Sequence, residues 1–274
     1  MKNNQVILAS ILKNESKNLK NLFRIYDKII SVYKEYYIII VESDSEDKTF
    51  IKCKNLLKKY NGKILKVNTR KFNKRTERIG FCRNIIIQEI KKKKKLTKYN
   101  HLIILDADKI NWMLSGKRLI DSIANAPRDW VGIFPNQILS YYDLFALRIK
   151  DKFNIDCYKY LKNKLNQKEN ICKLYRKIIF KNFFLIKKYN KRYIDVISAF
   201  GGMGIYKLSY AIKSSYSINS KNSCEHVMFN KKLTSSKKKL YIDTKLYNSI
   251  GLNEHILKSI FYCFFEKFTR KLLY

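Results

Sequence analysis

The sequence is poor in residues that mark linkers, repeats or disulfide frameworks. Of 274 residues, only 2 are proline and 8 are glycine, which argues against a linker-rich or repeat architecture. The 6 cysteines form no Cys-x-x-Cys pair and no zinc-ligand spacing, so a reducing compartment is expected. No apolar run is long enough to span a bilayer. The apolar stretch 6–12 is too short for a signal peptide and lacks a cleavage site. These absences favour a globular cytoplasmic protein.

Acidic residues are also scarce. There are 22 Asp and Glu against 58 Lys and Arg, which gives a net charge of +36. A positive field of this size would attract nucleic acid, an anionic membrane surface or a phosphorylated substrate. Codon bias is the competing explanation, because the excess is mostly lysine and is accompanied by abundant Asn, Ile and Tyr. The five lysines at 91–95 most simply form the solvated end of a helix. The charge alone therefore selects no partner.

Hydrophobic periodicity predicts alternating strands and helices in the first half of the chain. The predicted strands are 5–12, 37–41, 63–67, 100–105 and 130–134, and the predicted helices are 14–33, 49–60, 76–95 and 116–125. This alternation indicates an α/β fold of the Rossmann-like type, with a central, mostly parallel sheet flanked by helices.

The second half is less regular. We expect a helix over 141–153, a glycine-rich turn leading into a strand over 198–206, a helix over 225–232 and a strand over 239–243. The lysine-rich segment 158–189 has no clear assignment. One domain over 1–250 is expected, followed by a basic amphipathic helical segment over 251–274. That segment would lie on a membrane or pack on the body of the protein.

An acidic pair directly follows the fourth predicted strand. Strand alternation sends neighbouring side chains to opposite faces, so Asp106 and Asp108 point the same way. The carboxyl ends of parallel strands are where α/β proteins bind ligands. Carboxylate oxygens suit Mg²⁺ or Mn²⁺, usually alongside substrate phosphates. The competing interpretation is that one aspartate caps the next turn and the other is merely solvated.

Two other groups of polar residues could face the same ligand. The acidic loop 42–47 follows the second strand, so Glu42 and Asp44 could accept hydrogen bonds from a nucleobase or ribose. Helix capping by residues of this loop, such as Asp47, is the alternative. Arg78 and Arg83 lie in the early turns of the next predicted helix, where their charges could meet a diphosphate.

Two candidates come from the second half of the chain. Three of the 8 glycines fall within 201–204, and such a cluster permits positive φ and close approach of the backbone to a ligand. Glu225 and His226 lie at a predicted helix start, where they could supply a general base and a contact to a metal or phosphate. A lone histidine is more often structural.

In this order, the motifs resemble the GT-A-type glycosyltransferases. They are similar, more narrowly, to the fungal capsule-associated mannosyltransferase-like group. The resemblance covers 6–229. It is carried by the E-x-x-S-x-D-x-T pattern at 42–49, the D-x-D triplet at 106–108, and the segments 78–84, 141–148, 198–204 and 224–226.

The resemblance implies transfer of a sugar from a UDP- or GDP-linked donor to a hydroxyl of a glycan or lipid-linked acceptor. Asp108, assisted by Asp106, would hold Mn²⁺ or Mg²⁺ on the donor diphosphate, with His226 as a third ligand and His255 as a weaker candidate. Glu225 matches the position of the base in inverting members. Glu42 and Asp44 would face the nucleoside, and Arg78 and Arg83 the phosphates or sugar. Asp143 would touch the donor sugar, and Gly201 and Gly202 would line the acceptor side.

Two other classes of protein compete with the enzyme. A basic nucleic-acid-binding protein would show steep salt dependence. The sequence contains no recognised nucleic-acid motif and no stacking platform, so nucleic acid is not the expected partner. A non-catalytic protein peripheral at a membrane could use the same fold. Residues 150–191 match nothing in the resemblance, and they leave the acceptor undefined.

Overall fold

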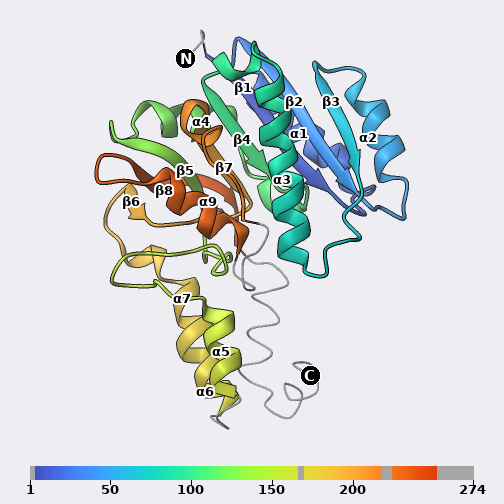
Figure 1. Cartoon of the computed structure of the whole chain (residues 1–274). Helices are drawn as coiled ribbons and strands as arrows, with labels where there is room; N and C mark the ends of the chain where they lie inside the picture. The colour runs from blue at the N-terminus through green and yellow to red at the C-terminus, as the bar shows by residue number, and fades with distance from the viewer. Residues whose placement is uncertain (1–3, 166–169, 218–223, 252–274) are drawn as a thin grey trace.

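The computed structural model describes residues 4–165, 170–217 and 224–251 (Figure 1). Their strands form one eight-stranded sheet in the order β3-β2-β1-β4-β7-β5-β8-β6. The strands are β1 (Gln5–Leu12), β2 (Glu35–Ser43), β3 (Gly62–Val67), β4 (His101–Leu105), β5 (Trp130–Gln137), β6 (Tyr193–Val196), β7 (Met203–Lys207) and β8 (Lys239–Ser249).

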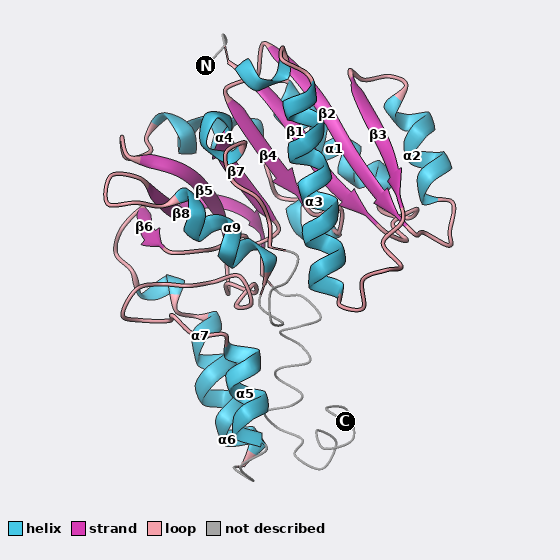
Figure 2. Ribbon diagram, in the orientation of Figure 1, coloured by secondary structure: helices cyan, strands magenta, loops and turns pink. Residues whose placement is uncertain are grey.

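Helices cover both faces of this sheet (Figure 2). They are α1 (Leu19–Ile30), α2 (Thr49–Leu57), α3 (Arg75–Lys92), α4 (Gly116–Ala124), α5 (Cys157–Leu165), α6 (Ile171–Tyr175), α7 (Lys181–Phe183), α8 (Leu208–Ala211) and α9 (Glu225–Leu233). Short 3₁₀ turns are η1 (Leu96–Lys98), η2 (Lys109–Asn111) and η4 (Ile186–Lys188), and η3 (Arg176–Phe180) is π-helical. The α/β class with a helix-flanked sheet is confirmed. Within the described ranges, no helix combines the length and apolarity needed to cross a membrane.

The order of the strands creates a ligand crevice beside β1. Strand β1 pairs in parallel with β2 on one side and with β4 on the other. The chain runs outward from β1 to β3 and then crosses to the other side of β1 as β4, so the connections diverge between β1 and β4. In open α/β sheets, ligands bind outside the carboxyl ends of the strands at such a point. Strand β7 is antiparallel to β4 and β5, which makes the sheet mixed.

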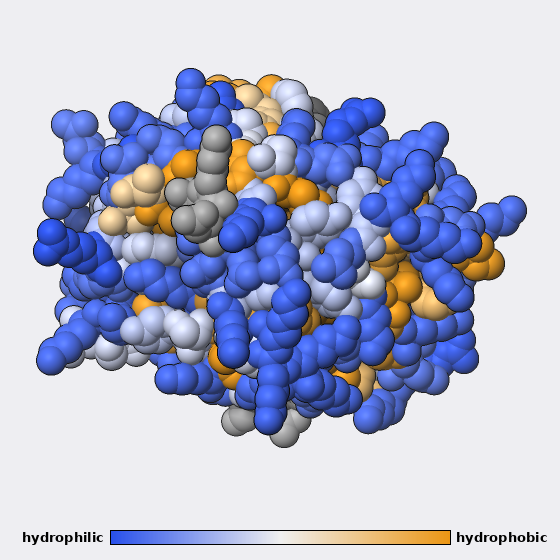
Figure 3. All heavy atoms as spheres, turned by 90° about the horizontal axis from the view of Figure 1, so that it is seen from above, coloured by the Kyte–Doolittle hydropathy of each residue, from blue (hydrophilic) through white to orange (hydrophobic). Residues whose placement is uncertain are grey.

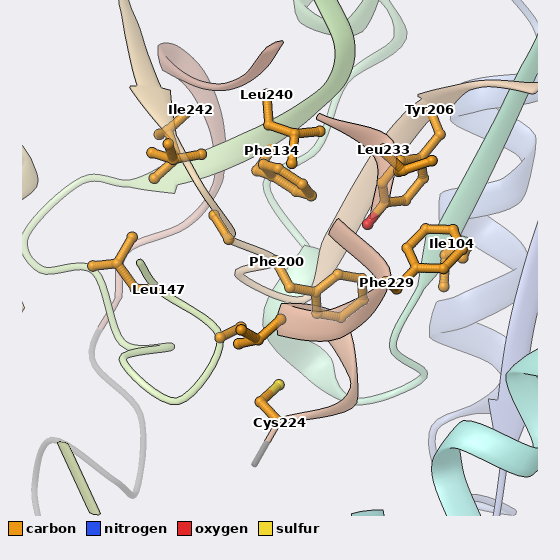
Figure 4. Packing of buried hydrophobic residues seen from close by; sticks show 14 of the residues in the cluster. Ile104, Phe134, Leu147, Phe200, Tyr206, Cys224, Phe229, Leu233, Leu240 and Ile242 are labelled. Atoms are coloured by element: carbon orange, nitrogen blue, oxygen red, sulfur yellow. The ribbon is translucent and has the colours of Figure 1, made fainter. Parts of the chain in front are cut away.

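Strand alternation divides the apolar core between the two faces. Val6 and Leu8 point to the face covered by α1, α2 and α4, while Ile7 and Ala9 point to the face covered by α3 and α9. On the second face, Phe200 and Phe229 pack among residues from β5, β7, β8 and α9 (Figure 4). Burying each large apolar side chain stabilises the fold by about 1.5–3 kcal/mol. This packing fixes α3 and α9 over the strand ends that carry the candidate site.

The helix predicted over 141–153 is wrong, because this segment is irregular. Its backbone pairs instead with a distant segment. The amide of Arg148 donates to the carbonyl of Ser198 at 2.8 Å, and the amide of Ile197 donates to the carbonyl of Arg148 at 2.8 Å. Leu144 and Leu147 are buried by these long-range contacts. Tertiary pairing therefore replaces the helical hydrogen bonds that the apolar spacing suggested.

The unassigned segment 158–189 is mostly helical. Helices α5, α6 and α7 extend from the body of the molecule, on the side where the parallel strands end (Figure 1). Strand β6 was not predicted, and β8 is longer than the predicted 239–243. Residues 252–274 lie outside the described part of the chain, so the predicted division into 1–250 and 251–274 stays a prediction.

Candidate functional site

The acidic pair lies at the carboxyl end of β4, at the crevice beside β1. The amide of Asp106 donates to the carbonyl of Gly202 at 3.0 Å, and the Asp106 side chain is 32% exposed. Asp108 is exposed, and its Oδ1 accepts a hydrogen bond from the amide of Ile110 at 3.2 Å. Asp108 therefore caps the η2 turn, as the structural interpretation predicted, while its carboxylate still faces solvent.

Carboxylates from three strand ends gather here. Burial, and then the charge of Asp108, raises the pKa of Asp106, although Arg83 acts in the opposite direction. Glu15 lies just after β1, and burial together with the charges of Asp108 and Asp47 raises its pKa. Sequence reasoning missed Glu15. The strand-end argument used for the other two acidic sites applies equally to β1 and would have found it.

Arg83 connects the acidic pair to the start of α9. Its guanidinium is buried, with Nη1 paired to Oε1 of Glu225 and Nη2 at 3.4 Å from Oδ1 of Asp106. The same group lies 5.0 Å from the ring centre of Phe200 and 5.6 Å from that of Tyr216. An arginine held between two carboxylates and two aromatic rings has a fixed position. The structure thus brings together Arg83, Asp106 and Glu225, which are far apart in the sequence.

Glu225 and His226 are both buried at the first turn of α9. The His226 ring stacks on Phe200 with 3.7 Å between ring centres. Neither ring nitrogen of His226 has a hydrogen-bond partner among the described residues. Burial, followed by the charge of Arg83, depresses the pKa of His226 well below its usual value, so the ring is neutral. Both side chains are held by neighbours, Glu225 by the ion pair with Arg83 and His226 by its stacking on Phe200.

The glycine loop is attached to the acidic pair through its backbone. Gly201 has φ +62° and Gly202 has φ +84°, values that favour glycine. A Cβ on Gly202 would lie 2.3 Å from Cγ2 of Ile110. Asp143 accepts hydrogen bonds from the amide of Gly201 at 3.0 Å and from the amide of Ala146 at 3.2 Å. Asp143 therefore holds this loop in place, whatever contact it makes with a ligand.

A network of side-chain amides supports the loop from below. Asn111 donates to the carbonyl of Gly202 at 2.9 Å, and Asn248 donates to the carbonyl of Gly201 at 2.7 Å. Gln137 in turn donates to Oδ1 of Asn248 at 2.9 Å. Sequence reasoning missed all three residues, because the contacts named here join positions 47 to 111 apart in the sequence and form no local pattern.

The loop after β2 is held together by its own acidic residues. Glu42 is buried, and its Oε1 accepts from the amide of Ser45 at 2.8 Å. Asp44, with φ +51°, accepts from the amide and hydroxyl of Thr69 at 2.9 and 2.5 Å. Asp47 accepts from the amide of Thr49 at 2.9 Å. Asp47 thus binds the first amide of α2, although the N-cap position is occupied by Lys48, whose side chain forms no cap hydrogen bond. Oε2 of Glu42 has no hydrogen-bond partner among the described residues.

Arg78 lies in the first turns of α3, away from Arg83. It precedes Cys82 by one turn, and residues four apart share a helix face. Cys82 is buried on the side of α3 that packs against β2. Arg78 and Arg83 are five positions apart, so they lie on different faces of α3. Within the described ranges, Arg78 forms no ion pair.

The residues of the crevice can be tested for their fit to a cation. Across residues 4–165, 170–217 and 224–251, no group of three or more His, Cys, Asp or Glu side chains is arranged to hold a metal ion. Mg²⁺ is commonly held by one or two carboxylates together with substrate phosphates and water. Asp106 and Asp108 supply such a pair, and the charge of Asp108 adds to burial in raising the pKa of Asp106. The pair fits a divalent cation, and His226 as a third ligand stays a prediction.

Solved structures share this architecture. No protein-family model and no curated protein matches the sequence. The mannosyltransferase PcManGT from Pyrobaculum calidifontis, in complex with GDP-Man and Mn²⁺, superposes with a TM-score of 0.52 at 10% identity, over 92% of this chain and 58% of that one. S. aureus TarS 1-349 in complex with UDP-GlcNAc superposes with a TM-score of 0.51 at 10% identity, over 92% of this chain and 60% of that one. This chain thus spans about three fifths of the length of either solved chain. It has the GT-A glycosyltransferase fold.

Proposed function

We propose that this chain is a metal-dependent glycosyltransferase that moves a sugar from a UDP- or GDP-linked donor to a hydroxyl of a glycan or lipid-linked acceptor. The observation that carries the proposal is the acidic pair at the switch point of a GT-A fold, with Arg83 beside it. Two solved structures with this fold are complexes with GDP-Man and Mn²⁺ and with UDP-GlcNAc. These complexes support both donor classes and the use of a divalent cation.

Asp106 and Asp108 would hold Mn²⁺ or Mg²⁺ against the donor diphosphate. When bound, such an ion neutralises the charge that grows on the leaving diphosphate. Glu42 retains one buried oxygen without a hydrogen-bond partner among the described residues, which suits an N–H or O–H donor of the nucleoside. Arg78, in the first turns of α3, would meet the phosphates or the sugar. Asp44, in the loop after β2, and Glu15, in the loop after β1, would also face the nucleoside.

Glu225 would be the base that deprotonates the acceptor. In the structure it is paired with Arg83. A bound diphosphate offers Arg83 an alternative anion, which would loosen the pair and free Glu225. Glu225 would then take the proton of the acceptor hydroxyl as its oxygen bonds to the anomeric carbon. The bond between the sugar and the diphosphate breaks at the same time, with inversion at that carbon.

Thermal shift with nucleotides tests this proposal directly. The full chain is heated with UDP, GDP or CMP, each with Mn²⁺ or with EDTA. A nucleotide at 100 times its Kd should stabilise the folded state by about 2.7 kcal/mol. We expect this stabilisation with UDP or GDP, only when Mn²⁺ is present. An equal shift in EDTA would contradict the cation assignment, and no shift with any nucleotide would overturn the proposed donor site.

A further inference from the structure

The helical projection formed by residues 157–165 and 170–188 has an unusual charge. The sequence from 157 to 188, of which 166–169 lie outside the described part of the chain, contains 10 lysines and arginines and one acidic residue, Glu169, a net charge of +9 over 32 residues. The whole chain carries +36 over 274 residues, so the density of positive charge is about twice as high here. A composition bias shared by the whole chain does not explain this local excess.

The positive charge lies along one face of the segment from α6 through η4. The exposed positions that line the same groove are Lys173, Arg176, Lys177, Lys181, Phe184 and Lys188. The buried positions between them are Leu174, Tyr175, Ile178, Ile179, Phe183 and Ile186. Spacings of three and four residues mark a helix with two distinct faces. The buried face packs inward, in part against α5. The other face presents a row of cations to solvent.

Aromatic side chains are interleaved with these cations. The exposed face borders a groove of about 850 Å³, lined by its lysines together with Phe180 and Phe184. The two phenylalanine rings meet edge to face at 5.5 Å, and Phe184 is 36% exposed. Ile155 and Tyr160, near the start of the projection, are about 40% exposed. The face of the molecule seen from above is also mostly hydrophilic, with smaller apolar patches between the polar side chains (Figure 3).

We propose that the projection docks on an anionic lipid surface through this basic aromatic face. Lysines with interleaved aromatic and apolar side chains suit the boundary between headgroups and acyl chains. Nucleic acid would also attract the charge, but nine of the ten cations are lysine, and arginine is preferred for nucleic-acid recognition. The proposal commits to the lipid surface. It does not depend on the proposed sugar transfer, because lipid binding can be measured without turnover.

The position of the projection gives this docking a consequence for the crevice. The projection extends on the side of the sheet where β1, β2 and β4 end (Figure 1). A protein resting on this face would hold the crevice on the membrane side of the molecule. An acceptor anchored in the same membrane would then reach the site by moving within the surface.

Vesicle cosedimentation of the full chain tests the proposal. Vesicles of phosphatidylcholine with 30% phosphatidylglycerol are compared with vesicles of phosphatidylcholine alone. The test variant carries Lys173→Glu, Lys177→Glu and Lys181→Glu. Each lysine near an anionic surface contributes roughly fivefold to binding, so the triple change should weaken it by about a hundredfold.

A matched control separates local from diffuse charge. Lys20→Glu, Lys52→Glu and Lys91→Glu change three exposed lysines, on α1, α2 and α3, by the same total charge. We expect this variant to bind anionic vesicles within about fivefold of the unmodified chain. Equal losses in the two variants would overturn the proposal, as would the absence of binding to anionic vesicles. Binding of single-stranded RNA, but not vesicles, that depends on the same three lysines would replace lipid with nucleic acid.

Fluorescence can report contact with the acyl region. Phe184→Trp is introduced together with Trp112→Phe, because Trp112 is itself exposed. In vesicles made with brominated lipids, the new tryptophan should be quenched relative to the Trp112→Phe variant alone. Unquenched fluorescence of vesicle-bound protein would show that Phe184 does not enter the surface and would contradict the proposed face.

Discussion

The two ends of β4 each carry an ionisable side chain whose pKa is shifted by burial. At the amino end, His101 is buried against Tyr33 and Trp130, and burial, followed by the charge of Lys207, lowers its pKa to about 4. At the carboxyl end, burial raises the pKa of Asp106. Both shifts favour the neutral form of the group, as burial does in general. A shifted pKa by itself therefore does not distinguish a binding site from a packed core.

The neighbours make the distinction. The neutral ring of His101 is hydrogen-bonded through Nδ1 to the hydroxyl of Tyr33 at 3.1 Å, so this end of the strand is complete without a ligand. Asp106 instead lies beside a second carboxylate, Asp108, and beside a glycine loop with positive φ values. Like charges gathered at a strand end are costly unless a cation joins them. We therefore expect a cation at the carboxyl end of β4 and none at its amino end.

The largest effect is expected from Asp108→Asn. This change keeps the shape of the side chain and its acceptor for Ile110, but removes the charge that would hold the cation. Sugar transfer and nucleotide-sugar hydrolysis should fall by about 10³-fold, because a cation contributes several kcal/mol to such a barrier. The free energy of unfolding should change by less than about 0.5 kcal/mol, because Asp108 is exposed. Turnover is measured over a Mn²⁺ titration.

Asp151→Asn is the matched control for this change. Asp151 is exposed, and its φ of +58° is a value that asparagine tolerates. We expect its turnover to equal that of the unmodified chain. If Asp108→Asn behaved like this control, the assignment of the carboxyl end of β4 as the cation site would be wrong.

The next effect concerns the buried ion pair beside the acidic pair. Arg83→Met leaves Glu225 buried without its counter-charge, and the loss of one partner of such a pair costs about 3–5 kcal/mol. The double variant with Glu225→Gln removes both charges and should recover about half of this loss. Urea unfolding of the two single variants and the double variant gives the coupling energy. Additive losses would show that Arg83 and Glu225 do not form the pair described.

A smaller effect is expected from the glycine loop. In Gly202→Ala, the new Cβ would meet Ile110 at 2.3 Å in a backbone conformation with φ +84°, which should cost about 2–3 kcal/mol. In Gly201→Ala, the nearest atom is Nε2 of Gln137 at 3.1 Å, so the cost should be about 1 kcal/mol. Chemical denaturation compares the two. If Gly201→Ala were the more damaging change, crowding against Ile110 would not be what requires glycine here.

Sequence reasoning performed best where local pattern determines structure. The alternation of apolar residues located β1 to β5 and the helices between them, and strand-end logic located Asp106 and Glu42 at one edge of the sheet. The reading of apolar spacing failed over 141–153, where the spacing of Leu144 and Leu147 suggested a helix. There the backbone of Arg148 pairs with that of Ser198, and no local signal specifies such a pairing.

The roles of individual site residues were harder to predict for a related reason. Asp143 is bound to the amide of Gly201, and Glu225 is paired with Arg83 across 142 positions. Each contact depends on how distant elements meet in the fold. The sequence identified the residue types that chemistry needs, but not which of them compensate one another. Glu15 was missed only because the argument was applied to two strands and not to the first.

The smallest effect returns to the amino end of β4. His101 has a folded-state pKa of about 4 against an ordinary value of 6.5. Between these two values, the unfolded chain binds a proton that the folded chain does not, so stability is lost as the pH falls from 6.5 toward 4. Lowering the pH from 7 to 5 should cost about 1–2 kcal/mol through this residue. In His101→Gln, this part of the pH dependence should disappear.

Urea unfolding of both proteins at pH 7, 6 and 5 measures the difference between them, in which the titration of all other groups cancels. Parallel profiles would show that His101 is not protected from protonation. Because His101 lies at the end of β4 away from the crevice, His101→Gln should keep sugar transfer within about twofold at pH 7. A large loss of turnover without a loss of stability would mean that the two ends of β4 are coupled. The separation between a packed end and a ligand-binding end would then fail.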